Sequence, residues 1–182
     1  ALFDARFAKP LDRARLCELA RRCGRMLVVE EHADPVPGDG ELLIDVAACG
    51  VNYADVLVRM GLYMSAKKYV GWPITPGFEV AGSVAALGAG VDDLAVGDRV
   101  LAVTRFGGYG ERVVVPRWAA LRTDLDPAIA ASLPTAFLTA WFAIHELAHP
   151  RPGQRALVHS AAGGVGGALV QLAKRAGCEV TG

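Results

Sequence analysis

The chain has 182 residues, 53% of them hydrophobic, and its 19 basic residues are matched by 19 acidic ones. This length and composition allow one large domain or two small ones, each with its own core. Because the charges cancel and are scattered along the chain, the sequence lacks the concentrated basic surface that binds nucleic acids or anionic membranes.

The cysteines and the apolar runs indicate a cytoplasmic protein. Cys17, Cys23, Cys49 and Cys178 form no C-x-x-C pair and lack the spacing of small secreted domains, so we expect reduced thiols. We expect Cys49 to pack as a small buried side chain. No apolar run is long enough to cross a bilayer, and the first residues do not resemble a basic-then-apolar leader.

Residues 1–33 have a strand–helix–strand pattern. Short apolar runs at 1–3 and 26–29 flank a stretch from Leu11 to Cys23 that has apolar residues at helical spacing. Two prolines and two glycines within residues 34–40 interrupt this pattern. Because neither a helix nor a strand continues through such a segment, we place a domain boundary there.

Residues 34–125 are predicted to form a small β-rich domain. Short runs with strand-like composition alternate with glycine turns, and they cover residues 42–47, 79–87, 99–103 and 111–115. From residue 128 to 147 the pattern becomes helical, with an interruption at Pro134. Residues 126–182 therefore begin a second domain, in which helices and strands alternate.

The second domain contains a glycine-rich loop between a predicted strand and a predicted helix. An apolar run at 155–158 precedes it, apolar residues at helical spacing follow it, and residues 178–182 form a further expected strand. Ala161, Gly163 and Gly166 stand at the three positions of a G-x-G-x-x-G motif. The motif is weak evidence by itself, and a plain strand-to-helix turn is the alternative; its context favours a pyrophosphate-binding loop at a helix N-terminus.

Three segments occur in order, "ACGVNYADVLVRMGLY" (48–63), "TPGFEVAGSVAALGAGVDDLAVGDRVLA" (75–102) and "LVHSAAGGVGGALVQLAKRAG" (157–177). Together they resemble the medium-chain dehydrogenase/reductase superfamily, in its zinc-free quinone oxidoreductase branch, which includes zeta-crystallin-like and vesicle amine transport protein-like members. The resemblance covers residues 35–182. It implies an α/β protein in which a GroES-like β domain precedes an incomplete Rossmann domain, with NADPH and substrate between them.

The resemblance also implies that no metal is bound. Where the alcohol dehydrogenase branch has a cysteine–histidine pair and a further histidine, this chain has Asn52, Tyr53 and Phe78. Glu79 is retained, but a catalytic zinc needs about three protein ligands. The four-cysteine lobe of the zinc-containing relatives is missing as well.

By resemblance, two residues are catalytic: Asn52 faces the nicotinamide and the substrate, and Tyr63 lines the cleft. The implied cofactor-binding residues are Asn52, Thr139, Gly163, Gly164, Val165 and Gly166. Asn52 is also suited to cap a helix beginning at residue 53 or 54. Tyr63 could equally be a core or surface aromatic. Asp55 and Arg59, four residues apart, are expected to pair on a helix surface.

The implied activity is hydride transfer from NADPH to a small quinone or α,β-unsaturated carbonyl. A non-catalytic adaptor like the vesicle proteins, or an enoyl-reductase module of a polyketide or fatty-acid synthase, are the alternatives. With only the first part of a Rossmann sheet, we expect the chain by itself to be inactive and to form homo-oligomers through exposed strand edges.

Residues 2–33 carry a second resemblance, to part of the C-terminal domain of deoxyxylulose phosphate synthase. It rests on "DARFAKPLD" and on the closing "VEEHA". No thiamine-diphosphate or metal-binding motif accompanies these residues, so the resemblance implies no catalytic residue.

Overall fold

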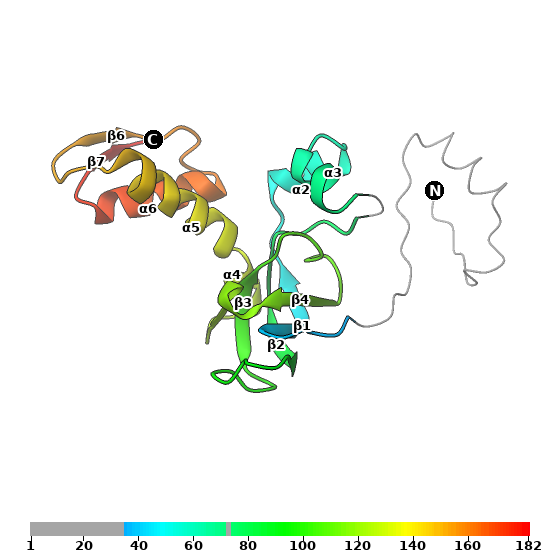
Figure 1. The fold of residues 1–182 in the computed structure, drawn as a ribbon. Helices are drawn as coiled ribbons and strands as arrows, with labels where there is room; N and C mark the ends of the chain where they lie inside the picture. The colour runs from blue at the N-terminus through cyan, green and yellow to red at the C-terminus, as the bar shows by residue number, and fades with distance from the viewer. Residues whose placement is uncertain (1–34, 72–73) are drawn as a thin grey trace. The chain divides into compact units, whose positions relative to one another are not determined.

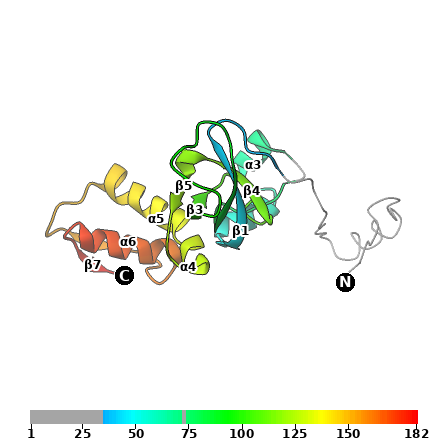
Figure 2. The same cartoon turned by 90° about the horizontal axis from the view of Figure 1, so that it is seen from below.

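The computed structural model describes residues 35–71 and 74–182 (Figures 1 and 2). The strand–helix–strand pattern expected over residues 1–33, and the second resemblance that it carries, lie outside the described residues.

The first part of the described chain is a five-stranded antiparallel sheet. Its strand order is β4-β1-β2-β3-β5. The strands are β1 (Glu41–Cys49), β2 (Glu79–Leu87), β3 (Arg99–Val103), β4 (Arg112–Pro116) and β5 (Ala120–Arg122). The ladder between β1 and β2 shifts its register twice, after Leu43 and after Val46. Such irregularities bend a strand and increase its twist.

Alternation of side chains along the strands builds the core of this sheet. In β3, Val100 and Ala102 are fully buried while Arg99 is exposed. Because successive side chains of a strand point to opposite faces, this period-two pattern of β3 places one apolar face on the core. In β1, Leu42 and Ile44 are fully buried, and Leu43 between them is buried as well, so this part of β1 is covered on both faces. The remaining core positions come mostly from valines of the neighbouring strands.

Short helices connect and flank the sheet. Two of them, α2 (Tyr53–Arg59) and α3 (Met64–Tyr69), lie between β1 and β2, and a 3₁₀ turn, η1 (Arg117–Ala119), joins β4 to β5. The chain then forms α4 (Pro127–Ala131), α5 (Pro134–Trp141) and a π-helical continuation of α5, η2 (Phe142–Ala148). The interruption predicted at Pro134 is confirmed, because proline begins α5 at the position that helices favour for it.

The last part of the chain is a β-α-β unit. Strand β6 (Arg155–Leu157) leads through the glycine loop into α6 (Gly164–Arg175), and β7 (Glu179–Thr181) pairs in parallel with β6. Figures 1 and 2 both show α6 (orange) alongside α5 (yellow), and the two helices are in contact. Ile144, Ala173 and Cys178 form the centre of a small apolar cluster beneath them.

Most of the predicted elements agree with the structure, and β2 and β3 have the predicted bounds. Strand β5 was not predicted, because its three residues are too few to show a periodic pattern. The expected burial of Cys49 is wrong, since its side chain is exposed. Cys49 is the last residue of β1, beyond the second register shift, and lies outside the core cluster. Within the described residues, no helix has the length and apolar character needed to span a membrane.

Candidate functional site

The side chain of Asn52 is held by a buried carboxylate. Asn52 directly precedes α2, so the predicted helix start at Tyr53 is confirmed. Its Nδ2 donates to Oε1 of Glu79 at 2.7 Å. Glu79 is the first residue of β2 and is only 3% exposed. Its other oxygen, Oε2, accepts a hydrogen bond from the backbone N–H of Thr135 at 2.8 Å. Glu79 thereby joins the loop that carries Asn52 to the first turn of α5.

Local backbone features make room for the Glu79 carboxylate. A buried carboxylate needs hydrogen-bond donors, and the N-terminus of α5 offers an unpaired N–H together with the positive end of the helix dipole. A Cβ at Gly50 would lie 2.1 Å from Glu79 Oε1 and 2.5 Å from the Ala131 carbonyl oxygen. Because a carboxylate only accepts, Asn52 must turn its NH₂ group toward Glu79. Its carbonyl oxygen is then the acceptor left for a ligand.

Asp55 is a second buried carboxylate in this region, and the expected surface pair with Arg59 is wrong. Asp55 is 2% exposed, whereas Arg59 is exposed. The Asp55 oxygens accept hydrogen bonds from the backbone N–H groups of Asn52 (2.8 Å) and Gly77 (2.9 Å). The spacing of four residues did not indicate this role, because the partners lie before α2 and in the segment before β2. Asp55 fixes both segments around Asn52.

The two carboxylates alter the titration of neighbouring groups. Partial desolvation raises the pKa of Tyr109 to about 12, although the residue is 40% exposed, with the charge of Asp55 and a hydrogen bond to it as further causes. Partial desolvation, followed by the charges of Asp55 and Glu79, raises the pKa of the Cys49 thiol above its ordinary value. Cys49 is therefore a weakly acidic thiol, although its side chain is exposed.

An aromatic cluster lies next to this polar network. Phe78, adjacent to Glu79, has its ring centre 5.4 Å from the ring of Tyr63 and 5.4 Å from the ring of Phe106. Tyr63 and Phe106 meet edge to face at 6.3 Å. All three side chains are half-buried, so part of each ring is open to a neighbouring space. Tilted and edge-to-face contacts of this kind are favourable arrangements for aromatic rings.

These rings line a pocket of about 770 Å³. Its other walls come from β3 and the segment after it, from β4 and η1, from α3 and from Leu138 of α5. The structure thus places Tyr63 in a pocket wall. Thr139 follows Leu138 on α5 and is exposed without lining the pocket. Asn52 is linked through Glu79 to Thr135 of α5, the helix that carries Thr139, whereas Tyr63 contacts the rings of Phe78 and Phe106.

The glycine loop forms the N-terminus of a twelve-residue helix. Gly163 precedes α6, and Gly163, Gly164 and Val165 are exposed. A Cβ at Gly164 would meet nothing within 4 Å, and the first turn of α6 contains no acidic residue. The N–H groups at the start of a helix have no partner within it and attract anions. This end of α6 is open to an anionic group of a ligand.

Gly166 has a different role from the other loop glycines. It is buried, and a Cβ there would lie 2.0 Å from the carbonyl oxygen of Ser160. Ser160 itself has a left-handed backbone conformation, with φ of 55°, and its carbonyl accepts a hydrogen bond from Gly163 N–H at 2.9 Å. Gly166 therefore allows the helix to approach the loop closely, as the third glycine of such motifs does.

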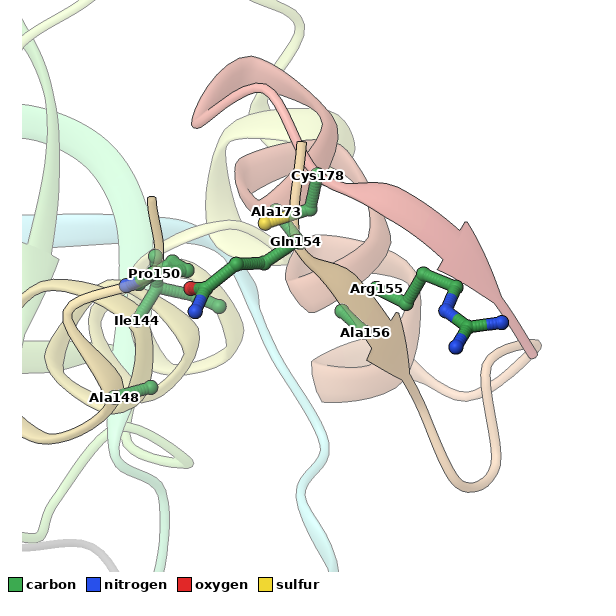
Figure 3. A pocket seen from close by; sticks show the side chains of 8 residues that line it. All are labelled: Ile144, Ala148, Pro150, Gln154, Arg155, Ala156, Ala173 and Cys178. Atoms are coloured by element: carbon green, nitrogen blue, oxygen red, sulfur yellow. The ribbon is translucent and has the colours of Figure 1, made fainter. Parts of the chain in front are cut away.

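A second pocket, of about 560 Å³, lies between η2 and the β6–α6 unit. Figure 3 shows the Gln154 side chain pointing toward Ile144 and Pro150, whereas the Arg155 side chain points away from them. The lining includes none of the predicted site residues. Its apolar residues overlap the small cluster around Cys178, so this pocket belongs to the packing of the β-α-β unit.

Within residues 35–71 and 74–182, no three His, Cys, Asp or Glu side chains are grouped so that they could hold a metal ion. The positions that carry zinc ligands in the alcohol dehydrogenase branch are used otherwise. Phe78 belongs to the aromatic cluster, and Asn52 is hydrogen-bonded to Glu79.

Sequence reasoning missed the bond network of Glu79 and much of the pocket. One signal for Glu79 was available: it is a lone acidic residue at the start of an otherwise apolar strand, and a buried acid needs partners. Arg105, Phe106 and Trp118 also line the pocket, and no local motif marks them.

Comparison with known proteins identifies the family. Residues 38–124 match the alcohol dehydrogenase GroES-like domain. The human synaptic vesicle membrane protein VAT-1 homolog is 42% identical over 147 residues, which are 78% of this chain and 36% of the relative. CurK enoyl reductase superimposes with a TM-score of 0.79 at 35% identity, over 83% of this chain and 48% of that one. The quinone oxidoreductase from Thermus thermophilus, solved alone and with NADPH, superimposes with a TM-score of 0.73 at 38% identity. The superposition covers 86% of this chain and 49% of that one.

The chain belongs to the medium-chain dehydrogenase/reductase superfamily, in the branch of quinone oxidoreductases and VAT-1 homologues. The predicted fold class, a GroES-like β domain followed by a parallel-sheet domain, is confirmed. The chain spans about a third of the human relative and just under half of the two solved structures.

Proposed function

We propose that this chain supplies the acceptor-binding domain and the pyrophosphate loop of a zinc-independent NADPH-dependent reductase. The reaction is hydride transfer to a quinone or an α,β-unsaturated carbonyl. NADPH supplies the hydride when bound, and a proton from solvent completes the reduction of the acceptor. Because no metal polarises the acceptor, the protein contributes binding, orientation and the exclusion of water.

On the acceptor side, Asn52 and Tyr63 are the proposed catalytic residues. The Asn52 amide is oriented by Glu79, so its carbonyl oxygen and remaining amide hydrogen are available to the nicotinamide and the acceptor. Tyr63 presents an aromatic wall next to Phe78. A catalytic group must be held within a fraction of an ångström of its working position, and the buried bonds of Glu79 provide that restraint.

On the cofactor side, the proposed ligands of the pyrophosphate are the N–H groups of Gly164, Val165 and Gly166, with Gly163 forming the entry. The residues fit this group because a Cβ at position 164 would occupy open space, where the helix N-terminus can receive an anion. Thr139, exposed on α5, is proposed to contact the cofactor. NADPH as the cofactor is supported by the quinone oxidoreductase relative, which was solved with NADPH.

The observation that carries this proposal is the pair of hydrogen bonds that Glu79 accepts, one from Asn52 and one from Thr135 at the start of α5. It is tested in the reductase that contains this chain, by following NADPH oxidation with 1,4-naphthoquinone for wild type and Asn52→Ala. We expect Asn52→Ala to lower kcat about 10- to 100-fold, as expected for loss of an orienting group. Equal kcat values in the two proteins would contradict the proposed role of Asn52.

Two relatives favour other functions for the same fold. The likeness to CurK supports an enoyl reductase, and the likeness to the VAT-1 homolog supports an adaptor without catalysis. The same assay separates them. Faster turnover of an α,β-unsaturated thioester than of naphthoquinone would favour an enoyl reductase. NADPH binding without turnover of either acceptor would favour the adaptor.

A further inference from the structure

The 770 Å³ pocket contains one charged side chain among aromatic and aliphatic ones. Tyr63, Phe78 and Phe106 form its aromatic wall, and Arg105 is the charged residue in its lining. No aspartate or glutamate lines it. Ligand pockets commonly combine a broad apolar surface with one or a few polar groups that fix the orientation of the ligand.

Arg105 is held in place without a carboxylate partner among the described residues. Its guanidinium carbon lies 5.1 Å from the centre of the Tyr69 ring, which also lines the pocket. The ammonium of Lys68 lies 4.9 Å from the same ring centre and adds a second positive charge nearby. A guanidinium stacked on an aromatic face keeps its N–H edge free for an anion. Arg117 differs from Arg105, because its guanidinium is paired with the carboxylate of Asp93.

The Thr104 hydroxyl in the pocket lining is already used. The Thr104 hydroxyl is buried and lies 3.0 Å from the Gly77 carbonyl oxygen and 2.6 Å from that of Phe106. Thr104 therefore offers a ligand no free hydroxyl proton, whereas the rings of Tyr63, Phe78 and Phe106 offer it apolar faces. An apolar planar group fits the aromatic wall, and an anionic group fits Arg105.

We propose that this pocket binds a planar, conjugated acceptor on the Tyr63–Phe78–Phe106 cluster and holds an anionic substituent of that acceptor at Arg105. That the ligand is a hydride acceptor rests on the proposed function. Binding of the ligand in this pocket needs neither NADPH nor turnover. The anionic substituent can be a carboxylate, a sulfonate or a phosphate, since all three accept two N–H bonds from a guanidinium.

Binding is tested first, without cofactor, using the matched pair 2-naphthoate and 2-naphthamide, which share a ring system and differ in charge. Isothermal titration calorimetry should show tighter binding of naphthoate. Arg105→Gln should weaken naphthoate binding about five-fold, the effect of one exposed charge pair, and leave naphthamide binding unchanged. Arg105→Lys should keep most of the preference, and Phe106→Ala should weaken both probes. Higher salt should reduce naphthoate affinity alone.

Arg151→Gln is the matched control, because Arg151 is an exposed arginine outside the pocket and its substitution should change neither affinity. Equal binding of the two probes by wild type, or equal losses in Arg105→Gln and Arg151→Gln, would overturn the inference. Failure of either probe to bind would overturn it as well.

Turnover separates this inference from the proposed function. Arg105→Gln should raise KM for 1,4-naphthoquinone-2-sulfonate about five-fold relative to 1,4-naphthoquinone, with kcat unchanged, because the charge acts in binding. An unchanged KM ratio would contradict the inference even if the enzyme is active. Charge-dependent naphthoate binding without any quinone reduction would instead contradict the proposed function and leave the pocket assignment supported.

Discussion

Glu79 accepts hydrogen bonds from two donors that come from different parts of the chain. Glu79→Gln keeps the shape of the side chain but removes its charge, and the bond to Asn52 forms again only if the Asn52 amide turns its oxygen toward the new NH₂ group. We expect this change to lower the free energy of unfolding by about 1–3 kcal/mol, because hydrogen bonds to a charged group contribute more than neutral ones. Urea unfolding followed by circular dichroism measures the difference.

The control for this prediction is Glu146→Gln. Glu146 is exposed on η2, so its substitution should change the free energy of unfolding by less than about 0.5 kcal/mol. Equal stability of the Glu79→Gln and Glu146→Gln proteins would show that the buried bonds do not stabilise the fold.

The raised pKa of Tyr109 predicts that the free energy of unfolding falls at alkaline pH. Partial desolvation and the nearby Asp55 raise its pKa to about 12 in the folded protein, against an ordinary value near 10. The unfolded chain therefore releases the hydroxyl proton of Tyr109 more readily than the folded one. The contribution of Tyr109 to the free energy of unfolding is complete below pH 10 and is lost as pH rises toward 12. Unfolding free energies of wild type and Tyr109→Phe, measured from pH 9 to 12, should differ in slope. Parallel curves would contradict the prediction.

Among the secondary-structure elements, the first turn of α6 contains one glycine needed for packing, Gly166, and one open to a ligand, Gly164. A Cβ at Gly166 would lie 2.0 Å from the Ser160 carbonyl oxygen, whereas one at Gly164 would meet nothing within 4 Å. Gly166→Ala should therefore lower stability by about 1–3 kcal/mol through overpacking. Gly164→Ala should leave stability unchanged within about 0.5 kcal/mol and weaken NADPH binding, because the added methyl group obstructs the phosphate.

Thermal unfolding and NADPH fluorescence titration measure these two effects separately. Unchanged NADPH affinity in Gly164→Ala would remove this loop from the cofactor site. A Gly166→Ala protein as stable as wild type would show instead that the loop can move away from the helix.

Elements with a strong local pattern were predictable from the sequence. β2 and β3 have the predicted bounds because their valines and alanines alternate or run continuously between glycine turns. The start of α2 followed from the preference of asparagine for the N-cap. The burial of Asp55 was not predictable in this way, because its partner Gly77 is 22 residues away and only the fold brings them together.

At the scale of the whole molecule, the candidate site is assembled from contacts between distant segments. The resemblance indicated Asn52 and Tyr63 as site residues. The contacts that hold their side chains come from residues distant in sequence, so the local sequence does not predict them. Asn52 depends on Glu79, 27 residues later, and Glu79 on Thr135, a further 56 residues on. Arg105 and Trp118 line the pocket because β3 and η1 lie beside it, and their own neighbours in sequence carry no motif.

We propose for the molecule as a whole that this chain supplies the acceptor-binding and pyrophosphate-binding parts of a reductase that transfers hydride without a metal. The most direct test is NADPH oxidation with 1,4-naphthoquinone, followed at 340 nm after dialysis against EDTA, with zinc measured by elemental analysis of the same sample. For that reductase we predict quinone-dependent turnover that chelation leaves unchanged, in protein with far less than one zinc per chain. Loss of turnover on chelation that added zinc restores, or no NADPH oxidation with any quinone, would contradict the account.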